Sequence, residues 1–210
     1  FVDILGMKKN KVELVYNPIN LEVIQKKAQD VNPKYEDYLN KDYFLQVSRL
    51  TQQKQPEHLV DIYYKLKQQG IKEKLYFIGN GEKVDLLEQK IKEYKLENDV
   101  FLLGQIENPY PFFKNAKLFV HTAKYEGLPT VLLESLAFGI PVVAYDCPTG
   151  PKDILGKNSE FGKLIPLNNK DIFAEKVCKL VNNDEKYKNY KKQSLIRAND
   201  FSMESNKIKL

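Results

Sequence analysis

Apolar and polar positions along this chain predict strands and helices in regular alternation. Apolar runs of four or five residues, typical of buried strands, are separated by segments with apolar residues at helical spacing. The strands are expected at 43–47, 75–78, 100–103, 118–121, 142–145 and 161–165, with a short one before them at 12–16. The helices are expected at 21–30, 56–69, 82–94, 109–115, 129–138, 171–181 and 185–198.

This alternation predicts an α/β fold from residue 42 onward: a Rossmann-like parallel sheet with helices on both faces. Residues 1–41 are expected to be a connector, because Asn17-Pro18 and Asn32-Pro33 are turn signals on either side of one helix. Ligands of such sheets bind at the carboxyl ends of the strands, near the point where the strand order reverses. The residues that follow each strand are therefore the candidates for a site.

The rest of the chain is organised around residues 124–145, KYEGLPTVLLESLAFGIPVVAY. Pro129 suits the first position of a helix, where its missing N–H costs nothing. Gly139 is expected to end this helix, since glycine is the usual residue after a helix C-terminus. The apolar run from Ile140 to Ala144 then predicts a strand that is covered on both faces.

Two glutamates interrupt this apolar stretch, Glu126 before the helix and Glu134 inside it, with seven residues between them. Helical side chains lean toward the N-terminus, so Glu134 is expected to reach the end where Glu126 lies. The free N–H groups around Thr130 and Val131 attract anions, whereas carboxylates favour neutral hydroxyl groups. A nucleotide sugar offers both. Taken alone, either glutamate is equally explained as a complement to the helix dipole.

Two cations, Arg49 and Lys54, follow the first predicted strand of the sheet and leave it at the same edge as Glu126. Arginine binds two phosphate oxygens at once and lysine supplies a compact charge, so the pair suits a diphosphate. An R-x4-K spacing by itself is usually a solvated loop. His121 ends another strand near the site, and a lone histidine is interpreted as a packed, hydrogen-bonded residue.

Composition and short motifs further limit the partners and sites that are expected. The chain of 210 residues is 42% hydrophobic and 29% charged, with a net charge of +5. No dense basic run with interleaved aromatic residues occurs, so nucleic acid is not favoured as a partner, while anionic membrane remains open. Cys147 and Cys178 lack metal or redox spacing and are interpreted as structural residues of a reducing compartment. There is no D-x-D motif and no Gly-rich GKS or GKT phosphate loop, so no metal site is predicted.

The segment EGLPTVLLESLAFGIPVVA resembles the E-x7-E signature of retaining GT-B glycosyltransferases of family 4, also called glycosyl transferases group 1. It resembles their C-terminal, donor-binding domain over about residues 40–200. YNPIN at 16–20 is similar to the hinge between the two domains of the family. The resemblance implies three parts: 1–41 as the tail of an N-terminal domain with the connector, 42–200 as the donor domain, and 201–210 as the start of a C-terminal crossover.

The resemblance also implies a role for each candidate residue. Glu126 would hold hydroxyls of the donor sugar and act in catalysis with the phosphate-binding Arg49 and Lys54, and Glu134 would hold the ribose. The rest of the donor-binding set would be Gly127, Leu128, Pro129, Thr130 and Val131 at the diphosphate, Gly79 and Gly81 in a tight turn, and Gln105 and Ile106 at the nucleobase. For Gly79-Asn80-Gly81 and Gly104-Gln105-Ile106, a plain turn or strand end is the alternative.

The activity implied is transfer of a hexose-type sugar, with retention, from a nucleoside diphosphate to a glycan or lipid-linked acceptor. CPTGPKDIL at 147–155 is similar to members that use UDP sugars, so UDP is the expected nucleotide, with no metal and no further cofactor. The acceptor would lie mainly on a missing N-terminal domain, and the protein would be cytoplasmic, at the inner face of the membrane. A nucleotide-sugar epimerase and a non-catalytic nucleotide-sugar-binding module are the alternatives.

Overall fold

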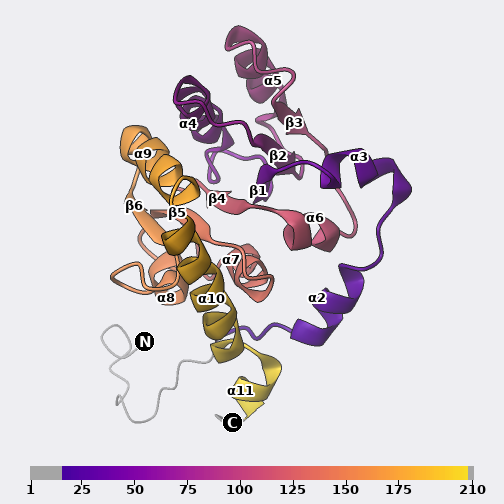
Figure 1. The fold of residues 1–210 in the computed structure, drawn as a ribbon, viewed down its shortest axis with the longest axis vertical. Coiled ribbons are helices and arrows are strands. Elements are labelled where there is room, and N and C mark those ends of the chain that lie inside the picture. The colour runs from indigo at the N-terminus through magenta and orange to yellow at the C-terminus, as the bar shows by residue number, and fades with distance from the viewer. Residues whose placement is uncertain (1–15, 208–210) are drawn as a thin grey trace.

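The computed structural model describes residues 16–207, and it confirms the predicted α/β fold. Six parallel strands form one sheet in the order β3-β2-β1-β4-β5-β6 (Figure 1). The strand order therefore reverses between β1 and β4. The strands are β1 Tyr43–Val47, β2 Lys74–Ile78, β3 Val100–Leu102, β4 Leu118–His121, β5 Val142–Asp146 and β6 Lys163–Pro166.

Helices cover both faces of this sheet. One face carries α4, α5 and α9, and the other carries α6, α7 and α8, with α2 and α3 beside α6 (Figure 1). The helices are α2 Leu21–Lys27, the 3-10 helix η2 Pro33–Tyr35, α3 Glu36–Leu39, α4 Pro56–Gln68, α5 Val84–Glu93, α6 Tyr110–Asn115, α7 Thr130–Ala137, α8 Pro151–Leu155, α9 Lys170–Val181, α10 Asp184–Asp200 and α11 Met203–Lys207.

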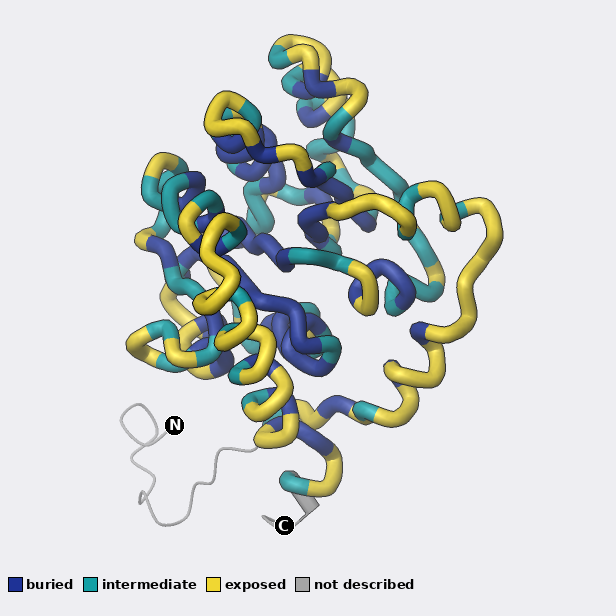
Figure 2. Tube along the Cα trace, viewed as in Figure 1, coloured by how far each residue is buried: buried dark blue, intermediate teal, exposed yellow. Residues whose placement is uncertain are grey.

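The sheet is buried on both sides because its central strands β1 and β4 are apolar apart from Gln46 and His121. Successive side chains of a strand point to opposite faces. Phe44 accordingly packs in the core under α4 and α9, while Tyr43 and Leu45 pack in the core under α6 and α7. The same alternation in β4 places His121 on the α7 side of the sheet, where its ring stacks on Phe119. Figure 2 shows the buried strands enclosed by helices whose outer faces are exposed.

Several bounds of the predicted elements are wrong, and one helix was not predicted. The last strand begins at Lys163 rather than at residue 161, because the Phe161 ring instead lies under the Arg197 guanidinium, 4.9 Å from it. The helix that was not predicted is α8, which Pro151 starts directly after Gly150, whose φ of 90° allows the sharp turn.

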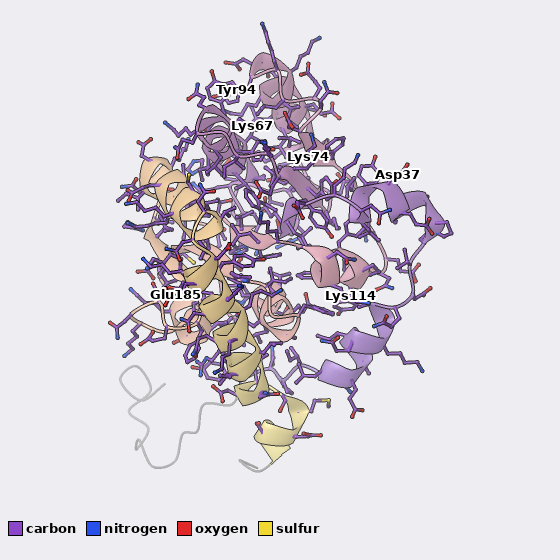
Figure 3. All side chains as sticks on the ribbon, viewed as in Figure 1. Asp37, Lys67, Lys74, Tyr94, Lys114 and Glu185 are labelled. Carbon is purple, nitrogen blue, oxygen red and sulfur yellow. The ribbon has the colours of Figure 1, made fainter. Side chains whose placement is uncertain are left out.

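The connector is fastened to the sheet domain. Asn108 donates from Nδ2 to the carbonyl groups of Lys27 and Asp30, at 2.8 and 3.2 Å. Lys114 of α6 donates to Gln29 at 2.9 Å, and Lys114 is labelled in Figure 3. The helix predicted at 21–30 ends earlier, at Lys27, and η2 and α3 follow it. The predicted strand at 12–16 and the tail before it lie outside the described residues, apart from Tyr16.

The two ends of the described chain lie side by side. Ile19 and Ser202 form a parallel bridge, and the Ile19 N–H donates to the carbonyl of Phe201 at 2.9 Å. The connector and the segment after α10 therefore leave the domain together. None of the helices within residues 16–207 is both long and apolar enough to cross a membrane.

Candidate active site

The strand order reverses between β1 and β4, and in sheets of this kind the crevice outside the carboxyl ends of the strands at this point is where ligands bind. Three backbone-directed contacts join the loops that follow β1 and β4. The Lys124 N–H donates to the Gln53 carbonyl at 2.8 Å, the Gln53 side chain donates to the Tyr125 carbonyl at 2.9 Å, and the Thr122 hydroxyl is 3.1 Å from the Lys54 carbonyl. The two loops therefore form one wall, which carries Lys54 from β1 and Glu126 from β4.

Glu126 is the centre of this wall. Its Oε1 lies 2.5 Å from Nζ of Lys54 and 2.7 Å from Nε2 of His121. The side chains of all three are largely buried, with exposed fractions of 7% for Glu126, 14% for Lys54 and 1% for His121. Burial by itself raises the pKa of the Glu126 carboxyl, but the hydrogen bonds and charges of His121 and Lys54 outweigh it, so the pKa is lowered. Glu126 is thus held as a carboxylate.

The two oxygens of Glu126 have different surroundings. Both donors bind Oε1, whereas Oε2 receives no hydrogen bond from the part of the chain that the structure describes. Oε2 is also absent from the set of fully buried polar atoms without partners, so solvent can reach it. A carboxylate oxygen oriented in this way is ready to accept hydrogen bonds from the hydroxyl groups of a ligand.

Glu134 has a less polar environment than Glu126. It projects from α7, and the Tyr110 hydroxyl donates to its Oε1 at 3.2 Å. Burial raises the pKa of the Glu134 carboxyl, and the hydrogen bond from Tyr110 offsets only part of this effect. Burial and the neighbouring carboxylate likewise raise the pKa of Tyr110 to about 12. Among residues 16–207 no cation pairs with Glu134, so a hydroxyl-bearing ligand would supply the hydrogen bonds that it lacks.

The N-terminus of α7 lies between these carboxylates in the sequence. The helix begins at Thr130, so the prediction that Pro129 is its first residue is wrong by one position. Pro129 is the N-cap, with ψ at 98°, and its carbonyl accepts from the Leu132 N–H at 3.0 Å. The N–H groups of Leu128, Thr130 and Val131 have no acceptor among the described residues. Such N–H groups, together with the helix dipole, favour an anion.

The loop after β5 supports the turn that carries Glu126. The Thr149 hydroxyl forms a short hydrogen bond with the Glu126 carbonyl. Gly150 packs so tightly that a Cβ added to it would lie 2.3 Å from the Gly127 carbonyl oxygen and 2.6 Å from Pro129. Segment 147–155 therefore has a structural role at this site, through its contacts with residues 126–129.

Gly79 and Gly81 pack against the loop after β1. A Cβ added to Gly79 would lie 1.9 Å from the Ser48 carbonyl oxygen, and one added to Gly81 would lie 2.3 Å from that of Leu50. The Leu50 N–H in turn donates to the Asn80 carbonyl at 2.8 Å. The tight turn expected here is therefore present, and it needs glycine because two backbone segments meet. Whether the turn also passes close to a donor stays a prediction.

Arg49 and Gln105 are exposed, and Ile106 is half-buried. Arg49 forms no ion pair within residues 16–207, so its guanidinium is free to bind a phosphate. Gln105 and Ile106 line a cleft of about 750 Å³ between the connector and the loop after β3. The predicted residues lie in the loops that follow the strands at one edge of the sheet or in the first turns of α7. Among the predicted side chains that the structure describes, Lys54 and Glu126 are joined in an ion pair.

The structure confirms the interpretation of His121 as a packed, hydrogen-bonded residue near the site, but the sequence did not predict its partner, Glu126. Tyr110 was not predicted to belong to the site. Tyr110 gave no signal, because its partner Glu134 lies 24 residues further along the chain. In the part of the chain described by the structure, no cluster of three or more His, Cys, Asp or Glu side chains could hold a metal ion.

Comparison with known proteins identifies the family. The model of the family described as glycosyl transferases group 1 matches residues 28–196, which is most of the chain. The chain belongs to this family. The resemblance drawn from the E-x7-E segment is therefore confirmed, and the crevice between β1 and β4 lies in the domain that this family model covers.

Two relatives show how much of a longer protein this chain matches. It is 34% identical over 197 residues to the N-acetylgalactosamine-N,N'-diacetylbacillosaminyl-diphospho-undecaprenol 4-alpha-N-acetylgalactosaminyltransferase of Campylobacter jejuni, covering 93% of the chain and 51% of that enzyme. Staphylococcus aureus TarM, in a crystal structure that holds UDP, is 28% identical with a TM-score of 0.74, over 80% of this chain and 34% of TarM. The chain spans about half, or less, of these relatives.

A third protein is similar in fold. Anabaena HepE, crystallised with UDP, superposes with a TM-score of 0.82 over 97% of this chain and 57% of its own, at 18% identity. The match extends through the connector and the segment after α10. The GT-B type of the fold is therefore shown across nearly the whole chain.

Proposed function

We propose that this chain is the donor-binding half of a glycosyltransferase that takes its sugar from a nucleoside diphosphate. The observation that carries the proposal is Glu126: a buried carboxylate whose Oε1 is held by Lys54 and His121 while Oε2 stays accessible. This oxygen would accept hydrogen bonds from the hydroxyls of the donor sugar. Glu134, about one turn into α7, would accept those of the ribose.

The diphosphate would lie between these carboxylates and the loop after β1. Arg49 is exposed and without an ion pair among the described residues, and the N-terminus of α7 presents unpaired N–H groups. Together with Lys54, these positive groups would neutralise the charge that develops on the leaving diphosphate as the glycosidic bond breaks. One well-placed donor of this kind is typically worth about 3 kcal/mol of transition-state stabilisation. A metal ion is not required for this chemistry.

The finer assignment is a hexose-type sugar transferred with retention from UDP to a glycan or lipid-linked acceptor. Retention is supported by the E-x7-E resemblance. UDP is supported by its presence in the crystal structure of TarM, and a lipid-linked acceptor by the diphospho-undecaprenol in the name of the Campylobacter jejuni relative. The acceptor would bind mainly to a second domain, at the cytoplasmic face of the membrane, where the net charge of +5 favours anionic lipid.

An epimerase would need a histidine that can reach the substrate, and His121 cannot fill that role. Its side chain is 1% exposed, its Nε2 is taken by Glu126, and its Nδ1 is completely buried. The arrangement around Glu126 therefore favours transfer over epimerisation. A non-catalytic binding module would use the same carboxylate to hold the sugar, so the activity measurement below separates it from transfer.

The proposal is tested with the longer protein that contains this chain. Incubation with UDP-glucose or UDP-N-acetylglucosamine should release UDP in the presence of a mixed pool of undecaprenyl-diphosphate-linked sugars. The variant Glu126→Gln should lower turnover at least about 100-fold while it still binds UDP. Normal turnover by that variant, or UDP binding without transfer or hydrolysis of any donor, would contradict the proposed activity.

A further inference from the structure

Glu126 shares one of its oxygens between two donors. Nζ of Lys54 and Nε2 of His121 both contact Oε1, and they come from different elements. Lys54 comes from the loop after β1, and its side chain is 14% exposed. His121 is the last residue of β4 and is almost completely buried. One donor therefore comes from a loop and the other from the sheet.

The proposed function makes two demands on Lys54. In the structure it is bound to Glu126, and in the ligand complex its charge would be needed at the diphosphate. A carboxylate with only 7% exposure that loses its partner becomes a buried, unpaired charge, which is strongly unfavourable. Without another donor on Oε1, Glu126 would retain Lys54 and oppose binding of the diphosphate.

We propose that His121 is a positioning residue that keeps Glu126 hydrogen-bonded while Lys54 moves to the diphosphate of the donor. This inference rests on the proposed function, since it assigns Lys54 to that ligand. It adds a step that the motif does not contain: an exchange of partners at Oε1 in which His121 stays in place. The same contact fixes the orientation of the carboxylate, so that Oε2 faces the ligand.

The surroundings of His121 suit a fixed donor. Its ring stacks on Phe119 at a centroid distance of 6.4 Å, in the core between the sheet and α7. Its Nδ1 is buried and has no partner among residues 16–207, so Nε2 is the ring atom that is available for Glu126. The other groups near Glu126 are Thr149, which binds only its backbone carbonyl, and the thiol of Cys147. Neither gives the carboxylate oxygens a hydrogen bond.

Titration with UDP tests this role, using two variants that differ only in the donor. His121→Leu fills the buried position without a hydrogen-bond donor, whereas His121→Gln places an amide N–H near the position of Nε2. His121→Leu should weaken UDP binding about tenfold or more, because Lys54 then stays with Glu126. His121→Gln should bind within about threefold of the wild type. Wild-type affinity in His121→Leu would overturn the inference.

A double variant separates positioning from a general structural role. In His121→Leu combined with Glu126→Gln, the neutral amide no longer requires Lys54, so UDP affinity should return to within about threefold of the Glu126→Gln protein. UDP lacks the transferred sugar that residue 126 would contact, which makes it the proper probe. If the double variant binds as poorly as His121→Leu alone, the histidine only supports the fold of β4, and the inference is wrong.

A measurement without ligand tests the contact between His121 and Glu126 independently of the proposed function. Long-range proton–nitrogen NMR spectra should show a hydrogen on Nε2 of His121, with a resonance that shifts in Glu126→Gln. A spectrum with the hydrogen on Nδ1 alone would overturn the inference whether or not UDP binds. Absence of UDP binding to the longer protein, together with the expected spectrum, would instead contradict the proposed function and the exchange of Lys54 that depends on it.

Discussion

At the scale of single residues, the two glutamates of the site differ in their partners. Glu126 has Lys54 and His121 on one oxygen, and its pKa is lowered, whereas Glu134 has only the neutral Tyr110 and its pKa is raised. The first arrangement stabilises the folded protein when the carboxylate is charged. The second destabilises it, because burial of Glu134 is only partly compensated.

The variant Glu134→Gln should therefore be more stable than the wild type at pH 7, by about 1 kcal/mol, while it binds UDP more weakly. The folded pKa of Glu134 lies above its unfolded value of 4.5, so the wild type gains stability as the pH falls through the folded pKa. The difference in the free energy of unfolding between the two proteins should disappear as the pH approaches 4.5. Urea unfolding curves at a series of pH values measure this difference.

The matched control for this prediction is Glu88→Gln on the exposed face of α5, which should leave stability unchanged at every pH. If the difference in the free energy of unfolding between Glu134→Gln and the wild type stays constant with pH, titration of Glu134 is not its cause. A Glu134→Gln protein that is less stable at pH 7 would show that the carboxylate is better compensated than its contacts indicate.

At this scale the sequence could predict which residues lie at the site but not what each of them touches. Glu126 and Lys54 are 72 residues apart, and the contact between them depends on how the loops after β1 and β4 join. Lys54 was expected to face a phosphate, and its ion pair with Glu126 was not predicted. The contact of His121 could not be predicted from the sequence either. Its position at a strand end was visible, but the side of the sheet that its side chain faces follows from the register of β4.

At the scale of elements, the loop after β1 is fixed by the two glycines that follow β2. Alanine at position 81 would place its Cβ 2.3 Å from the Leu50 carbonyl oxygen, and the backbone would have to shift. Gly81→Ala should therefore reduce the free energy of unfolding by about 2–3 kcal/mol. Denaturant unfolding monitored by circular dichroism measures the loss.

Gly127→Ala provides the control, because a Cβ at that position would meet no atom within 4 Å. Its stability should stay within about 0.5 kcal/mol of the wild type. If both alanine variants unfold at the wild-type midpoint, the close approach between the two loops does not exist in solution. A large loss of stability in Gly127→Ala, with none in Gly81→Ala, would show that position 127 rather than position 81 is tightly packed, contrary to the structure.

The elements themselves were largely predictable, because short apolar runs and helical spacing follow directly from burial on a two-sided sheet. Strand β1 was predicted with the observed bounds, and α7 began one residue later than expected. The errors fall where local signals conflict with tertiary contacts. Phe161 was predicted as the first residue of the sixth strand because it is apolar. Its ring instead packs against the Arg197 guanidinium, and the strand starts two residues later.

At the scale of the whole molecule, the reversal of strand order determines where the site lies. The loops after β1 and β4 meet there, which brings Lys54 into contact with Glu126. The connector and the segment after α10 leave the domain side by side at Ile19 and Ser202.

The central claim, that this domain holds a nucleoside diphosphate in the crevice between β1 and β4, is tested most directly by calorimetric titration of the chain with UDP in the absence of metal. The account predicts saturable binding with one site, weakened about tenfold or more by Arg49→Ala and by Glu134→Ala. Glu88→Ala should leave the affinity unchanged. UDP binding that neither Arg49→Ala nor Glu134→Ala affects, or no binding to either this chain or the longer protein, would contradict the account.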